Sequence, residues 1–90
     1  MNSKLKNSDT DFLFKAILSL ENEEECYRFF EDLCTSPELK AMSQRLVVAK
    51  MLTEKKVYSE IVKETGASTA TINRVKRALF DNDTYGYTLV

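Results

Sequence analysis

The chain has 90 residues, of which 43% are apolar and 30% charged, and its formal net charge is −1. A chain of this length makes one domain, residues 1–90, and buries only about 60–65% of its unfolded surface, so its core is marginal without a partner. The sequence contains no histidine, no Gly-rich phosphate loop and no cluster of metal ligands, which argues against an enzyme and against a zinc site.

The elements that we predict are all helices, because the sequence has one proline, two glycines and no strand-like alternation. Residues 1–8 are polar, and a first helix is predicted from there to about Leu20. Its candidate N-caps are Ser8, Asp9 and Thr10. The apolar residues of this helix spread over more than half of its circumference, so a single buried face does not accommodate them.

A second helix is predicted after a break at residues 21–22. It begins in the acidic run 23–25, where carboxylates favour the positive end of the helix dipole, and it continues to Cys34. This helix is also apolar on more than one side.

The two cysteines, Cys26 and Cys34, would lie about 12 Å apart along one helix, which is too far for a disulfide. We expect both to be small buried apolar residues in a reducing cytoplasm. The sequence shows no signal peptide and no apolar run of membrane length, so a membrane association is not expected.

A third helix is predicted from the Ser36-Pro37-Glu38 start, which combines a capping serine, a proline at the first helical position and an acid, to about Glu54. Val48 and Met51 widen its apolar stripe. The stripe itself consists of Leu39, Met42, Leu46, Ala49 and Leu52.

The first three helices have more apolar surface than a monomer of this size can bury. A second copy of the chain is the simplest way to cover it. We therefore predict an obligate, intertwined homodimer in which residues 9–54 supply the dimerisation helices.

Residues 57–80 are typical of a helix-turn-helix, in which two short helices are joined by a tight turn. The first helix ends near Thr65, and Gly66 can adopt the positive φ that redirects the chain. Ser68 is a good N-cap for the second helix, which is predicted from about Thr69 to Leu79.

The second of these helices places Ile72, Val75 and Leu79 on one stripe, which would hold it against the domain. Its opposite face carries small side chains near the start, then polar ones, then basic ones, as a helix that reads the major groove requires. The residues that we predict to bind DNA are Lys63, Ser68, Thr69, Ala70, Thr71, Asn73, Arg74 and Arg77.

Within this set, Asn73 can pair with adenine, and Ala70 or the Thr69 methyl group can contact a thymine methyl. Lys63 and Arg77 are better placed for phosphates. The charge distribution agrees: residues 1–34 have four basic and eight acidic side chains, whereas residues 35–80 have nine basic and four acidic ones. The basic part of the chain is therefore the part that we expect to face DNA.

Another interpretation remains open. The same pattern fits an ordinary helical hairpin, in a helical protein–protein interaction module whose acidic first half is the contact surface.

The tail, residues 81–90, has a helix stop at Asp81-Asn82 and an apolar set that could dock on another surface: Tyr85, Tyr87, Leu89 and Val90.

Three motifs in this order resemble the Trp repressor superfamily, and most closely its YerC/YecD group: ECYRFFEDLCT, MSQRLVVAKML and GASTATINRVKRAL. The resemblance covers roughly residues 10–80. It implies an all-α fold of five to six helices, an intertwined homodimer, and a DNA-binding transcriptional regulator, with repression as the favoured output. Its partner would be a double-stranded DNA operator.

The resemblance also implies a candidate ligand site. In the Trp repressor two arginines flank bound tryptophan, and the matching positions here are Arg45 and Arg74, with Thr71 beside them. This sequence departs from the repressor at Val75 and Lys76, where the repressor has glycine and serine. Since the Val75 side chain could fill the ligand space, L-tryptophan is the less favoured alternative to having no cofactor.

Overall fold

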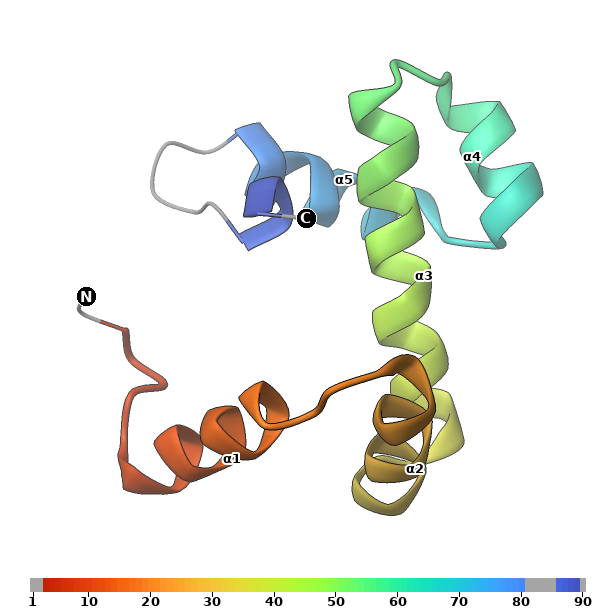
Figure 1. Ribbon diagram of the computed structural model, residues 1–90. Helices are drawn as coiled ribbons and strands as arrows, with labels where there is room; N and C mark the ends of the chain where they lie inside the picture. The colour runs from red at the N-terminus through yellow and green to blue at the C-terminus, as the bar shows by residue number, and fades with distance from the viewer. Residues whose placement is uncertain (1–2, 81–85, 90) are drawn as a thin grey trace. The chain divides into compact units, whose positions relative to one another are not determined.

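The computed structural model describes residues 3–80 and 86–89, and every regular element within these ranges is helical (Figure 1). The all-α prediction is therefore confirmed. The chain divides into two compact units, Met1–Ser36 and Pro37–Val90. The elements are α1 (Ser8–Leu18), α2 (Glu23–Leu33), α3 (Ser36–Thr53), α4 (Tyr58–Thr65), α5 (Thr69–Phe80) and the short 3₁₀ helix η1 (Gly86–Leu89).

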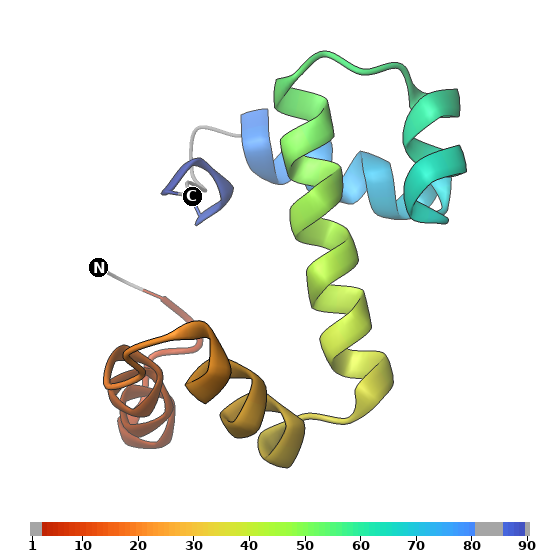
Figure 2. The same ribbon diagram turned by 45° about the vertical axis from the view of Figure 1, so that its right-hand side comes forward.

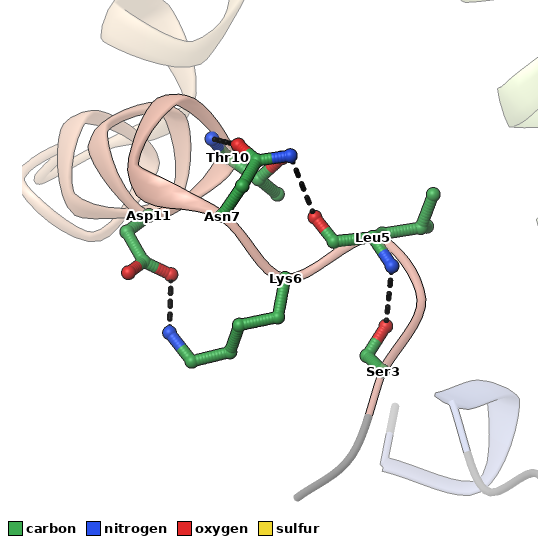
Figure 3. Close-up of polar contacts among 6 residues, drawn as sticks. All are labelled: Ser3, Leu5, Lys6, Asn7, Thr10 and Asp11. Carbon is green, nitrogen blue, oxygen red and sulfur yellow. Dashed lines mark hydrogen bonds and ion pairs between the residues drawn. The ribbon is translucent and has the colours of Figure 1, made fainter.

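Helix α1 is capped by Asn7, and the prediction of a cap at residues 8–10 is wrong. Asn7 is extended, with φ −161°, and its Oδ1 accepts a hydrogen bond of 2.8 Å from the backbone N–H of Thr10 (Figure 3). Lys6 Nζ lies 2.6 Å from Asp11 Oδ1 beside this cap (Figure 3). An asparagine one residue before the first predicted cap thus satisfies one of the free N–H groups in the first turn of α1.

The other end of α1 also differs from the prediction, because the helix ends at Leu18 and not at Leu20. The Ser19 backbone N–H donates to both Lys15 O and Ala16 O, at 3.2 and 3.1 Å. Its hydroxyl donates to Ala16 O at 2.6 Å. Ser19 therefore closes the last turn by serving as the C-cap.

Helix α2 begins where the sequence predicts, and Asn22 supplies its cap. Asn22 Oδ1 accepts from the Glu25 N–H at 2.9 Å, and Glu25 Oε1 accepts from the Glu21 N–H at 2.9 Å. These reciprocal bonds resemble a capping box and explain the break at residues 21–22. The helix ends one residue before Cys34, which is extended.

Both cysteines, Cys26 and Cys34, are free, as their spacing predicts. They are half-buried, however, so the prediction that they are buried is wrong for the single chain. Neither α1 nor α2 contains any buried residue. Phe12 and Leu18 are 76% and 83% exposed, which leaves large apolar surfaces open on this unit.

The second unit contains the buried core. In the two ribbon views α4 runs beside the C-terminal half of α3, and α5 crosses that same half (Figures 1 and 2). Half-buried Tyr58, Leu79 and Tyr87 pack against the core. The buried core residues are Val48, Ala49, Met51 and Leu52 of α3, Ile61 of α4, Ala67 of the turn, and Ile72 and Val75 of α5.

Only part of the apolar stripe predicted for α3 is buried. Ala49 and Leu52 are buried, but Met42 and Leu46 are 38% and 45% exposed. The core takes its α3 residues from position 48 onward, since α4 and α5 lie beside that half of the helix (Figure 2). Most of the tail lies outside the described residues, but Tyr87 does dock on the core.

Helix α3 ends in a Schellman motif with a lysine in the left-handed position. Lys55 has φ +61°, its N–H donates to Leu52 O at 3.0 Å, and the Lys56 N–H donates to Met51 O at 3.0 Å. A residue with a Cβ is strained there by about 1 kcal/mol relative to glycine.

We expect Lys55→Gly to raise the free energy of unfolding by up to about 1 kcal/mol, because glycine removes this strain. Denaturant unfolding followed by circular dichroism measures the change. Lys56→Gly is the matched control, since residue 56 has no positive φ and gains nothing. Equal effects of the two substitutions would contradict the explanation.

Candidate nucleic-acid interface

The turn between α4 and α5 is built as the sequence predicts. Gly66 is left-handed, with φ +72°, and its N–H donates to Val62 O at 2.9 Å. Thr65 Oγ1 then accepts from the Ala67 N–H at 3.1 Å, and Ser68 Oγ accepts from the Thr71 N–H at 3.1 Å. These three hydrogen bonds thereby fix the direction in which α5 extends from the turn.

One residue that holds this turn was not predicted. Gln44 of α3 donates through Nε2 to the carbonyl oxygen of Thr65 at 3.0 Å. The sequence gives no signal for this contact, because the two residues lie far apart in the chain and Gln44 appears only as a polar residue beside an apolar stripe. The bond ties the long helix to the turn that starts α5.

Gly66→Ala should cost about 1–2 kcal/mol of unfolding free energy, because the left-handed backbone brings Cβ close to the following carbonyl oxygen. No atom lies within 4 Å of a Cβ at Gly66, so the cost is conformational and not steric crowding from a neighbour. Gly86→Ala is the control, since its site is equally open and its φ is not positive. Thermal unfolding of both variants tests the difference, and a neutral Gly66→Ala would contradict it.

Helix α5 is held by the anchors that its spacing predicts. Ile72 and Val75 are fully buried, and Leu79 is half-buried against the same core. The opposite face is free of the core. Its exposed residues are Thr69, Ala70, Asn73, Arg74, Lys76, Arg77 and Phe80.

The basic residues of this region are available to a ligand. Lys63 of α4, Arg74 and Arg77 are all exposed, and none has an ion-pair partner within residues 3–80 and 86–89. By contrast, Lys6–Asp11 and Arg28–Glu24 are paired within the first unit. Basic side chains that are free of carboxylates and lie near one helix face can bind the phosphates of DNA.

Two of the predicted DNA-binding residues already serve the fold. Ser68 Oγ accepts from the Thr71 backbone N–H and donates to Thr71 Oγ1, at 3.1 Å in each case. Thr71 is also half-buried. Both hydroxyls are thus engaged at the N-terminus of α5.

A polar contact between α4 and α5 was missed by the sequence analysis. The Tyr58 hydroxyl donates to Asn73 Oδ1 at 3.0 Å, and Lys76 Nζ lies 5.6 Å from the centroid of the Tyr58 ring. A shallow hollow follows the same side of α5 and is lined by Ala70, Asn73, Lys76, Arg77 and Phe80. Tyr58 therefore borders the face that the sequence predicts to read bases.

The residues of the candidate tryptophan site lie on different helices and differ in solvent exposure. Arg45 is half-buried on α3, and Arg74 is exposed on α5. Val75 is fully buried in the core. Two further hollows flank α3, one beside Tyr87 and one beside Thr65, and neither they nor the hollow on α5 is lined by Arg45, Thr71 or Arg74.

Residues 3–80 and 86–89 contain no group of three or more His, Cys, Asp or Glu side chains arranged to hold a metal ion. No helix within these ranges combines the length and apolar character that crossing a membrane requires.

The fold and this face together define an all-α protein with a helix-turn-helix whose second helix exposes a polar and basic surface. The family model described as Trp repressor protein matches residues 8–89. The chain belongs to the Trp repressor family, as its three motifs indicate.

Individual relatives agree with this assignment. The chain is 58% identical over 83 residues to the uncharacterized protein YerC of Bacillus subtilis (strain 168). The matched region covers 91% of this chain and 80% of YerC. A crystal structure of a provisionally assigned Trp repressor from Staphylococcus aureus has a TM-score of 0.90 and 55% identity, with 96% of this chain and 85% of that chain covered. A TrpR-like protein from Eubacterium eligens ATCC 27750 gives a TM-score of 0.90 and 52% identity, with coverage of 98% and 90%.

Proposed function

We propose that this protein is a sequence-specific DNA-binding transcriptional regulator, in the first instance a repressor, that acts through its helix-turn-helix. The observation that carries the proposal is the exposed face of α5, which is small at Thr69 and Ala70, polar at Asn73 and basic at Arg77. Membership of the Trp repressor family supports the same function. We infer that it works in the cytoplasm, where free thiols persist and a regulator meets its DNA.

We further propose that the active form is an intertwined homodimer. The exposed apolar residues of α1, of α2 and of residues 42–47 in α3 support this, because solvent exposure of so many large side chains is unfavourable in a monomer. In such a dimer the two α5 helices would enter successive major grooves about 34 Å apart and bind a near-palindromic operator. Sedimentation equilibrium that shows a stable monomer at micromolar concentration would contradict this assembly.

We propose that DNA binding does not require tryptophan. Val75 is fully buried where the Trp repressor has glycine, so its side chain could fill the space that the ligand needs. Selection of bound duplexes from a random pool, with and without free tryptophan, tests this proposal together with DNA binding. Enrichment of one motif in both conditions supports it, whereas enrichment only with tryptophan overturns it.

A gel-shift assay with random duplex DNA separates this function from the alternative of a protein–protein interaction module. Exposed acidic and apolar side chains in the first unit favour that alternative as the second candidate. Under the proposed function the purified protein shifts random duplex DNA at low salt. A protein that leaves all DNA free at low salt is not a DNA-binding regulator.

Asn73→Ala should abolish discrimination at one base pair of each half-site. A bidentate contact from an asparagine gives about 1–3 kcal/mol of discrimination, which corresponds to roughly 5- to 150-fold between bases. Comparison of the enriched motifs of the wild type and the variant measures this loss. Unchanged preference at every position would remove Asn73 from the set of residues that read bases.

A further inference from the structure

The contact between Tyr58 and Asn73 links the start of α4 to the middle of the exposed face of α5. Tyr58 belongs to the first turn of α4 and is half-buried against the core, so its ring is held in place by packing. Its hydroxyl extends toward the surface and donates to Asn73 Oδ1 at 3.0 Å. Asn73 itself is exposed.

This hydrogen bond matters because a side-chain amide has two nearly equal ends. The oxygen accepts and the NH2 group donates, and a rotation of about 180° about the last side-chain bond exchanges them. An exposed asparagine without a partner can therefore offer either end to a base. A phenol hydroxyl is a better hydrogen-bond donor than acceptor, so the Tyr58 bond favours the orientation in which Oδ1 faces Tyr58 and the NH2 group is available for a ligand.

Lys76 strengthens the same arrangement. Its Nζ lies 5.6 Å from the Tyr58 ring centroid, within the range of a cation–π contact. A positive charge beside the phenol polarises the hydroxyl and makes it a better hydrogen-bond donor. Lys76 is exposed and lines the hollow that also contains Asn73.

We propose that Tyr58 is a positioning residue for base recognition: by donating to Asn73 Oδ1 it makes Asn73 present its NH2 group to an acceptor on a purine edge. This inference rests on the proposed DNA-binding function. The acceptors that fit the NH2 group are N7 of either purine and O6 of guanine in the major groove, and the second lone pair of Oδ1 can still accept from adenine N6 in a bidentate contact. Tyr58 contacts no base in this role and acts only through Asn73.

The test is a selection from a random duplex pool with the full-length wild type, Tyr58→Phe, Asn73→Ala and the double variant. Phenylalanine keeps the ring that packs on the core and removes only the hydroxyl. Tyr58→Phe should reduce the purine preference about fivefold, the value of one neutral hydrogen bond, at the base pair that Asn73→Ala affects. Adding Tyr58→Phe to Asn73→Ala should cause no further loss there.

A second measurement does not depend on DNA. The side-chain NH2 resonances of Asn73, assigned by their absence in Asn73→Ala, should shift in Tyr58→Phe while the backbone amides of the core keep their positions. Unshifted resonances would show that the hydrogen bond is absent in solution and would overturn the inference.

The outcomes of the selection are distinct. If the wild type selects no sequence, the proposed function fails and this inference fails with it. If the wild type selects a motif but Tyr58→Phe keeps the same preference at the Asn73-dependent pair, only the inference is overturned. A uniform weakening of all sequences by Tyr58→Phe would likewise overturn it, because that result assigns Tyr58 a purely structural part.

Discussion

Ile72→Ala should lower the free energy of unfolding by about 2–5 kcal/mol. Ile72 is 0% exposed and lies among Val48, Ile61 and Val75, so that alanine leaves a cavity enclosed by three helices. Small domains are stable by only about 5–15 kcal/mol, and a chain of 90 residues lies toward the lower end. The substitution should therefore leave a substantial unfolded population at physiological temperature.

Urea unfolding followed by circular dichroism measures this loss, at one fixed protein concentration because a dimer would link stability to concentration. Val62→Ala is the matched control, since Val62 lies on α4 next to buried Ile61 but is itself 38% exposed. Its effect should stay within about 0.5 kcal/mol. If the two variants lose equal stability, the three-helix core is not the main source of stability.

The features that the sequence predicts correctly are those decided by neighbouring residues. The turn at Gly66 needs a left-handed residue, and the cap at Ser68 needs a hydroxyl two or three residues before a free N–H, so both follow from local chemistry. The anchors Ile72 and Val75 follow from helical periodicity alone. Their burial requires no knowledge of which helix covers them.

Other features depend on choices that neighbouring residues do not decide. Asn7 and the three residues after it can all cap a helix, and only the backbone shows that Asn7 does so. The buried side of α3 depends on where α4 and α5 lie, which explains why Val48 is in the core and Leu46 is exposed.

The candidate site shows the same limit. The exposed face of α5 was predictable, but the bonds from Gln44 to Thr65 and from Tyr58 to Asn73 join residues of different helices. No periodicity or local motif connects positions so far apart in the chain. Residue types therefore indicate which side chains could read DNA, whereas the packing of the helices determines how those side chains are oriented.

Arg77→Ala should weaken binding to every DNA sequence by about tenfold or more per subunit, because a hydrogen bond to a charged group contributes about 1.5–3 kcal/mol. Arg77 is exposed on the outer face of α5, and no carboxylate within residues 3–80 and 86–89 forms an ion pair with it. A phosphate contact of this kind carries no sequence information. The enriched motif should therefore stay the same while the affinity falls.

Titration of a fixed duplex at several salt concentrations measures both quantities. Each lost phosphate contact lowers the slope of log affinity against log salt by about 0.9, so the slope should fall by about one per subunit. Lys15→Ala removes the same charge from exposed α1, in the acidic part of the chain, and should leave the slope unchanged. Since the two variants have equal net charge, an equal loss of affinity would mean that overall charge, and not the basic end of α5, governs binding. A loss confined to some sequences would instead place Arg77 on a base edge.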